Sequence, residues 1–281
     1  MRTIALIAAR NEERVLAAAL DNFVRQDISF YLIDNDSTDA TVAIAERYHD
    51  RGLVGIERMP RGETYEWERI LRRKEELAQL LDADWFIHAD ADEIRLPSRS
   101  DETLASALER ADRDGFNAAN FLEFSFMPTR ESPTHEHPHF QETMLWYYPF
   151  APQFPHRLTA WKKQQSRVDL AASGGHLVAF EGLKIFPETL RMRHYLCLSV
   201  PHAIEKWVNR RFADDEVAKG WHGWRAKMTA DAIELPSEKE LRRYISDDAL
   251  DPSGPRSHHF MQDAYEAWVA RTPSPADQRD S

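Results

Sequence analysis

Three carboxylates follow an apolar run of strand length near residue 90. Asp90, Asp92 and Glu93 come directly after residues 84–89, DWFIHA. Acidic groups this close repel one another unless a cation joins them, and a hard divalent ion prefers oxygen ligands and leaves open positions for substrate phosphates. A solvated acidic turn is the alternative, which the preceding apolar run disfavours. We therefore expect Asp90 and Asp92 to bind Mn²⁺ or Mg²⁺.

Two more polar clusters follow apolar runs in the same way. A cluster with Arg10 and Glu12 follows residues 3–8, and an acidic turn that begins at Asp34 follows residues 29–33. The carboxyl ends of parallel strands meet at one edge of an open sheet, where ligands bind. The sequence contains neither G-x-G-x-x-G nor G-x-x-x-x-G-K, so it lacks the glycine-rich loops that cradle phosphates. We therefore expect side chains at this edge to grip a nucleotide, with a metal on its diphosphate.

The elements that must position these clusters alternate regularly over the first 126 residues. Strand-length apolar runs alternate with amphipathic helical patterns, which is typical of a wound, mostly parallel α/β sheet. Residues 127–175 are rich in Pro, His and aromatic residues and indicate a long loop region with one or two irregular strands. From residue 201 to about 271 the pattern is mostly helical. We expect strands at 3–8, 29–33, 54–58, 84–89, 116–126, 176–180 and 190–195, and helices at 13–26, 41–48, 66–81 and 101–112.

Composition excludes several classes of protein. The 281 residues carry 36 Lys and Arg against 47 Asp and Glu, a net charge of −11, which argues against a nucleic-acid partner. One cysteine, Cys197, excludes an intrachain disulfide and a Cys-rich zinc site, and we expect it to be a buried small hydrophobe. No apolar run reaches the roughly 18 residues of a membrane span, and the N-terminus lacks the order of a signal peptide. We expect a cytoplasmic protein with at most a peripheral membrane contact.

Four segments, in this order, resemble family 2 glycosyltransferases of the GT-A fold: ALIAARNEE, YLIDNDSTDAT, DWFIHADADEI and MRHYLCLSVPHAIEK. The resemblance covers about residues 1–215, and the combination is more specific than any one segment. It implies a GT-A-like, Rossmann-type sheet, and we expect the catalytic domain at 1–200, a helical extension at 201–271 and a disordered tail at 272–281. It also implies sugar transfer from a nucleotide-diphosphate donor to a glycan, lipid-linked or small-molecule acceptor in glycan biosynthesis, with inversion and a divalent metal. UDP is the family's default nucleotide, and GDP and dTDP remain open.

The resemblance also implies roles for individual residues. Asp92 lies where the metal is bound, Asp90 lies near the ribose and the metal, and His194 can complete the metal shell if its strand lies beside the fourth. The helix at 66–81 has several basic residues where the family has one Arg, and Arg72 is our choice among them. The implied donor-binding set is Ala8, Arg10, Glu12, Asp34, Asp36, Arg72, Asp90, Ala91 and Asp92.

An inverting transfer needs a general base near the acceptor hydroxyl. The family's catalytic carboxylate has no clean match in this sequence. Asp169 is the first candidate, and Glu142 and His176 follow it. A solvated loop acid is the alternative for Asp169.

Other features admit a structural and a functional interpretation. His135, His137 and His139 alternate and could trap a metal, although lining an acceptor cleft or simple exposure is favoured. The LWYYPF aromatics at 145–150 could stack on sugars or pack in the core, and the GWHGWR segment at 220–225 could form a lid or a helix junction. Two other functions remain open: a catalytically inactive nucleotide-sugar- or carbohydrate-binding protein, and a metal-dependent phosphohydrolase. The hydrolase is disfavoured because its nucleophile motif usually lies on the first strand.

Overall fold

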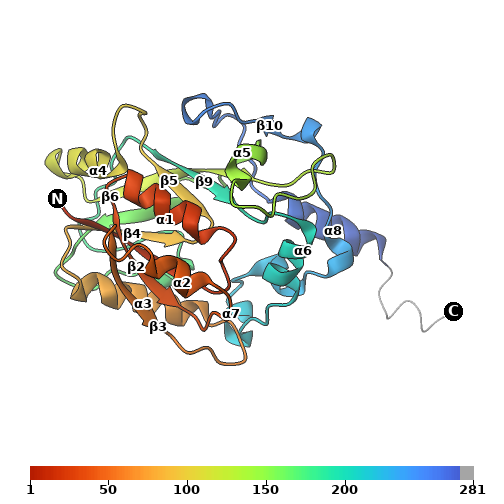
Figure 1. The fold of residues 1–281 in the computed structure, drawn as a ribbon, viewed down its shortest axis with the longest axis horizontal. Coiled ribbons are helices and arrows are strands. Elements are labelled where there is room, and N and C mark those ends of the chain that lie inside the picture. The colour runs from red at the N-terminus through yellow and green to blue at the C-terminus, as the bar shows by residue number, and fades with distance from the viewer. Residues whose placement is uncertain (273–281) are drawn as a thin grey trace.

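A ten-stranded mixed sheet forms the centre of the computed structural model, which describes residues 1–272 (Figure 1). Its main order is β10-β7-β6-β8-β4-β1-β2-β3, and β9 joins β6 to β5. Pairing is parallel along β4-β1-β2-β3 and between β6 and β9, and antiparallel elsewhere. The strands are β1 Thr3–Ala9, β2 Ser29–Asp34, β3 Leu53–Arg58, β4 Trp85–Asp90, β5 Glu93–Leu96, β6 Ala118–Phe126, β7 Trp146–Phe150, β8 Arg157–Lys162, β9 Leu190–Tyr195 and β10 Arg242–Arg243.

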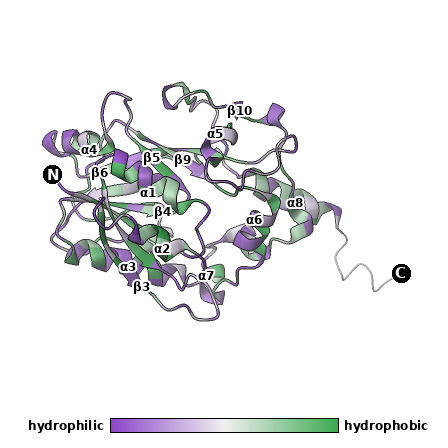
Figure 2. Cartoon of the chain, in the orientation of Figure 1, coloured by the Kyte–Doolittle hydropathy of each residue, from purple (hydrophilic) through white to green (hydrophobic). Residues whose placement is uncertain are grey.

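Helices cover both faces of the sheet because successive side chains of a strand point to opposite faces. On β1, Ala5 and Ile7 join the core beneath α1, α2 and α4, whereas Ile4 and Leu6 join the core beneath α3. Figure 2 shows largely hydrophobic strands at the centre and mixed colouring on the outer helices α3 and α4. The bounds are α1 Leu16–Arg25, α2 Thr41–Glu46, α3 Trp67–Leu80, α4 Leu104–Arg113 and α5 Phe140–Thr143.

The segment after residue 199 is less helical than expected. It contains two short α-helices, one α-helix of 12 residues, a π-helical turn and several 3-10 turns, because Gly220, Gly223, Pro236, Pro252 and Pro255 interrupt the pattern. Its apolar side chains, including those of Trp207 and Met261, enter the core beneath α1. The elements are α6 Val200–Ala203, the π turn Ile204–Val208, α7 Asp214–Ala218, α8 Phe260–Arg271 and the 3-10 turns Gly223–Lys227, Ala230–Ala232, Glu238–Glu240 and Asp247–Ala249.

The α/β fold class and its wound sheet are confirmed. The strand expected at 176–180 is wrong: isolated bridges at Leu177 and Ala179 replace it, next to a 3-10 turn at Ala171–Ser173. The four-residue strand β5 was not expected, because an acidic turn runs straight into it. Apart from Thr272, the predicted tail lies outside the described residues, and no helix within them is long and apolar enough to cross a membrane.

Candidate functional site

A cavity of about 520 Å³ opens at the carboxyl ends of β1 and β4. In the sheet register Ala8 lies opposite Asp90, and Ala9 lies opposite Asp34 at the end of β2. The three polar clusters of the sequence therefore meet at one edge, as predicted. Segments that follow β9 close the other side: the π-helical turn at Ile204–Val208, residues 220–225, and the start of α8 at Gln262. In Figure 1, α6 and α8 lie side by side, and α7 lies apart from them below α2.

Part of the predicted site lines this cavity. The lining includes Ala8, Arg10, Glu12, Asp90, Ala91, Asp92, His176 and His194. It also includes Asn35, next to the predicted Asp34, whose buried carboxylate instead accepts the backbone N–H of Ser37 at 3.2 Å.

The other predicted residues are engaged outside the cavity lining. Asp36 pairs with Arg58 at 2.6 Å, and Arg72 pairs with Asp169 at 3.1 Å. Glu142 is exposed and lies 3.5 Å from His139. For Asp169 to act as the base, an acceptor would have to approach it beyond the cavity lining, so its role stays a prediction, as do those of Asp36, Arg72 and Glu142.

Asp92 is buried and already has two cationic partners. Lys206, on the π-helical turn, donates to Oδ2, and His194 Nε2 lies 3.5 Å from the same oxygen. Despite burial, these two side chains hold the pKa of Asp92 far below its usual range. His194 thus approaches Asp92, but the expected strand arrangement is wrong, because β9 pairs with β5 and β6 and not with β4. The role of His194 as a metal ligand stays a prediction.

Glu123, on β6, lies behind this pair at the centre of a buried network. Its carboxylate accepts from His194 Nδ1 at 2.7 Å and from Arg157 Nε at 2.8 Å, and His156 Nε2 lies 3.3 Å away. Burial would raise the pKa of Glu123, but Arg157 and then His194 hold it well below its ordinary value. Burial would lower the pKa of His194, but the carboxylates of Asp92 and Glu123 raise it to about 10. His194 is therefore a cation in this arrangement, held by two carboxylates.

Two other cavity carboxylates lack such compensation. Burial raises the pKa of Glu12 to about 7 despite Lys206, and Glu12 Oε2 accepts no hydrogen bond from the described residues. Burial and then the neighbouring Glu93 raise the pKa of Asp90. Both groups favour a cation or a hydrogen-bond donor supplied by a ligand.

The donor types here fit a divalent ion. Glu123 fixes Nδ1 of His194 and leaves Nε2 facing Asp92, which is how metal-binding histidines are commonly held. Carboxylate oxygens of Asp90 and Asp92 suit Mg²⁺ or Mn²⁺. An ion on Asp92 would nevertheless have to displace or share with the Lys206 ammonium.

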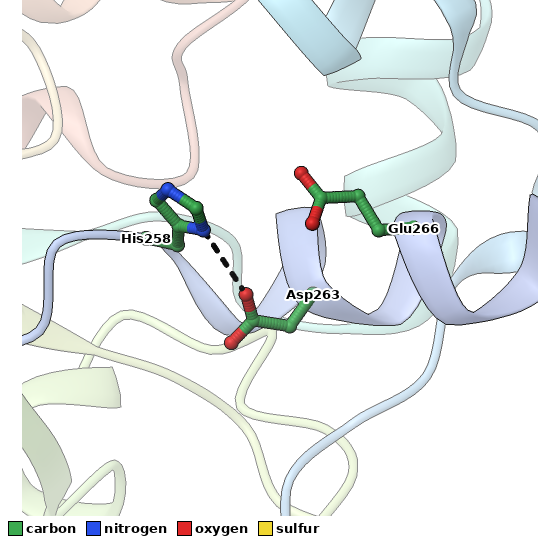
Figure 3. Close-up of side chains that lie close together, drawn as sticks. All are labelled: His258, Asp263 and Glu266. Carbon is green, nitrogen blue, oxygen red and sulfur yellow. Dashed lines mark ion pairs between the residues drawn. The ribbon is translucent and has the colours of Figure 1, made fainter.

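Among the described residues, one set of three potential ligand atoms lies within 4.8 Å of one another, and it is elsewhere: His258, Asp263 and Glu266 (Figure 3). The site predicted from Asp90, Asp92 and His194 is therefore wider than a closed metal cage. Asp263 also pairs with Arg256, which already balances its charge. We assign no ion to this surface cluster.

The end of the cavity away from Asp92 is aromatic and basic. Trp221, His222, Trp224 and Arg225 of the GWHGWR segment line it, as a lid would, and Trp224 also packs edge-on against Trp207, with ring centroids 5.6 Å apart. Phe150 lines the cavity, whereas Tyr147 and Tyr148 are buried in the core. His135 and His137 bond to Thr143 Oγ1, at 2.9 Å each, and do not line the cavity.

Several functional side chains escaped the sequence analysis. Glu123 sits in an apolar strand with no local sign of its partners, and no motif surrounds Arg157 or Arg210. Arg225 belongs to the GWHGWR segment noted in the sequence, but the sequence does not indicate which residues it meets. Lys206 had one signal, because it lies within the quoted segment MRHYLCLSVPHAIEK, twelve positions after His194. Its pairing with Asp92 required the fold.

A family profile described as Glycosyl transferase family 2 matches residues 4–163. No curated protein matches the chain. Similar solved structures include S. aureus TarS, with 12% identity, a TM-score of 0.42, and coverage of 77% of this chain and 41% of that one. A TarS 1–349 complex with UDP-GlcNAc has 12% identity, a TM-score of 0.40, and coverage of 69% and 58%. A putative glucose-1-phosphate thymidylyltransferase from Bacillus anthracis, in complex with a sucrose, has 9% identity, a TM-score of 0.33, and coverage of 98% and 97%. The chain spans less than half the length of the first of these proteins.

Proposed function

The chain belongs to glycosyl transferase family 2, and from this premise we propose that it transfers a sugar from a nucleotide-diphosphate donor to an acceptor hydroxyl. The observation that carries the proposal is the meeting of Arg10, Glu12, Asn35, Asp90 and Asp92 at one sheet edge, inside one cavity. Ligands of open α/β sheets bind at this edge.

Cationic side chains beside these acids suit the diphosphate. Lys206 and Arg210 line the same part of the cavity, and burial of Glu12 is offset first by Lys206 and also by Arg210. Among the described residues, no carboxylate pairs with Arg10 or Arg210; Arg210 lies over the ring of Tyr65, 4.6 Å from its centroid. We propose that Arg10, Glu12 and Asn35 contact the nucleoside of the donor, with UDP as the default and GDP or dTDP as alternatives.

We propose that Asp90, Asp92 and Nε2 of His194 hold Mn²⁺ or Mg²⁺ when the donor is bound. His194 would have to release its Nε2 proton as the ion binds, because an imidazolium has no lone pair to offer. A divalent ion there would neutralise the charge that develops on the leaving diphosphate. Lys206 would then share Asp92 with the ion or turn to the phosphates. The chain's own contribution is to orient His194 through Glu123 and to keep Asp92 ionised.

We propose inversion at the anomeric carbon and a glycan, lipid-linked or small-molecule acceptor. Of the three predicted base candidates, His176 lines the cavity. Arg157 Nη1 lies 3.2 Å from Nδ1 of His176, and because arginine always donates, Nε2 of His176 carries the proton. We propose that His176 donates to substrate in this state and does not accept a proton.

The proposal is tested by turnover of a panel of nucleotide sugars, with and without Mn²⁺. We expect the protein to release a nucleoside diphosphate from one of the donors. In Asp92→Asn, the rate of this release should fall at least 100-fold. The control is Asp50→Asn, which changes a fully exposed side chain. Full activity of Asp92→Asn would contradict the proposal. Binding of UDP without turnover of any donor would instead support the inactive binding protein.

A further inference from the structure

The cavity is basic although the chain is acidic. Of the charged residues that line it, five are Arg or Lys and three are Asp or Glu, in a chain of net charge −11. Lys206 and Arg210 lie beside Glu12 and Asp92. Arg157 and Arg225 lie at the other end, among the rings of His156, His176 and His259. Lys206 and Arg210 thus lie beside Glu12 and Asp92, and Arg157 and Arg225 lie beside the histidine rings, with Arg210 still close enough to Arg225 to lower its pKa.

Arg225 is the most exceptional of these cations. Its guanidinium stacks on Trp224, 4.7 Å from the ring centroid, and makes no ion pair or hydrogen bond with the described residues. Burial lowers the pKa of Arg225, and repulsion from Arg157 lowers it further. Arg225 is partly buried, and a partly desolvated cation without a partner gains free energy when a ligand supplies the opposite charge.

Arg157 and His176 add donors beside it. Arg157 donates a hydrogen bond from Nε to Glu123 at 2.8 Å and another from Nη1 to His176 Nδ1 at 3.2 Å. Burial, followed by Arg157, keeps the pKa of His176 well below its ordinary value, so the ring is neutral and Nε2 carries its proton. No acceptor for Nε2 lies among the described residues. Arg225, Arg157 and His176 therefore offer donors and no acceptor to this end of the cavity.

We propose that this end of the cavity is a second anion subsite, formed by Arg225, Arg157 and Nε2–H of His176, which takes a carboxylate, sulfate or phosphate group carried by the transferred sugar or by the acceptor. The inference deepens the proposed function and rests on it, since it places the donor diphosphate at Lys206 and Arg210. Guanidinium groups suit such anions because they donate in a planar fork.

The closing experiment measures binding to the whole protein by calorimetry. UDP, UDP-glucose and UDP-glucuronic acid are compared first. If the sugar carries the anion, we expect UDP-glucuronic acid to bind about 10- to 100-fold more tightly than UDP-glucose, the range of one charged hydrogen bond. If the acceptor carries it, methyl glucuronide or glycerol phosphate binds to the UDP complex, and the neutral methyl glucoside binds at least 10-fold more weakly.

Two variants and one control complete the test. In Arg225→Gln the preference for the anionic probe should fall to about one, and Arg225→Lys should restore part of it. Arg113→Gln, at a side chain that is 72% exposed, should keep the full preference. Thermal melts confirm that each variant folds.

The two proposals fail in different ways. An equal loss of affinity for all three nucleotides in Arg225→Gln would overturn the second subsite, because Arg225 would then serve the diphosphate. A protein that binds UDP but shows no preference for any anionic probe would also overturn it. Absence of UDP binding would contradict the proposed function, and inorganic sulfate titrated into the nucleotide-free protein would then decide on the subsite alone: Arg225-dependent binding supports it, and no binding overturns it.

Discussion

Replacement of Glu123 by Gln tests whether the buried network behind Asp92 organises the site. The amide keeps the size of the side chain but removes its charge and puts an NH₂ group among donors. Glu123 is fully buried and accepts from His194 at 2.7 Å and from Arg157 at 2.8 Å. In the variant, Arg157 loses its buried counter-charge, His194 keeps only Asp92, and one of the two cations faces a donor.

The expected magnitude follows from burial. Breaking a buried ion pair by removing one partner costs about 3–5 kcal/mol, whereas an exposed pair contributes about 0–1 kcal/mol. Glu57→Gln is the matched control, because Glu57 also holds an arginine, Arg73 at 2.8 Å, but is partly exposed and lies outside the cavity lining. We expect a loss of about 3 kcal/mol or more for Glu123→Gln and under about 1 kcal/mol for Glu57→Gln.

Urea unfolding followed by circular dichroism measures this difference, and calorimetry measures the functional consequence. Loss of the partner that orients a metal-binding histidine typically costs 10- to 100-fold in affinity. We expect that loss in Mn²⁺ affinity of the UDP complex of Glu123→Gln, and no change in Glu57→Gln. Equal unfolding free energies for the two variants, or unchanged Mn²⁺ affinity in a folded Glu123→Gln, would refute the reasoning.

Two further variants test the packing under the site. Lys74 is buried, with Nζ 3.0 Å from Ala89 O, and burial lowers its pKa to about 8. Holding it charged therefore costs the fold about 3 kcal/mol below pH 8 and nothing above the unfolded pKa of 10.5, so Lys74→Met should raise the urea-unfolding free energy at pH 7 by about 1–3 kcal/mol. That gain should shrink as pH rises from 8 to 10.5, and a gain independent of pH would contradict it. Gly175 has φ +91°, and a Cβ there would lie 3.0 Å from His88 Nε2, so Gly175→Ala should lower the melting temperature by several degrees more than Gly115→Ala, which has φ +84° and open space around it. Equal decreases in melting temperature for the two variants would contradict this, because they would show that the positive φ alone, and not the contact with His88, determines the destabilisation.

The fold was largely predictable because its core strands are continuous apolar runs. Residues 3–7 and 85–89 are buried on both faces of the sheet, so their residues need no alternation. Helix α4 was predictable from its spacing, with Leu104, Ala107, Leu108 and Ala111 on one buried face. The segment from residue 209 to 259 was not, because its glycines and prolines break the helices that its periodicity suggests.

The site residues that directly follow a strand were predictable from the sequence, whereas those brought in from segments far away in the sequence were not. Asp90 and Asp92 follow β4 directly, and the rule for open sheets places them at the ligand edge. Glu123 and Arg225 come from β6 and from a 3-10 turn, and their neighbours are decided by packing across more than 30 positions. Asp169 illustrates the converse: a loop acid next to a predicted strand is paired with Arg72 of α3, which no local pattern indicates.

The three cavity carboxylates differ in a way that explains how an acidic edge can be buried at all. Asp92 is neutralised by Lys206 and His194, which come from segments more than 100 positions away. Glu12 and Asp90 have no such partner, and burial raises the pKa of each. Because Lys206 and His194 already compensate the desolvation of Asp92, a ligand gains little free energy by approaching Oδ2 of Asp92 alone. A ligand gains most binding free energy by placing a cation or hydrogen-bond donors next to Glu12 and Asp90 and its own negative charge next to Lys206 and Arg210. A metal-bound nucleoside diphosphate carries both kinds of group, which is why its chemistry suits this edge better than a free cation or a free anion does.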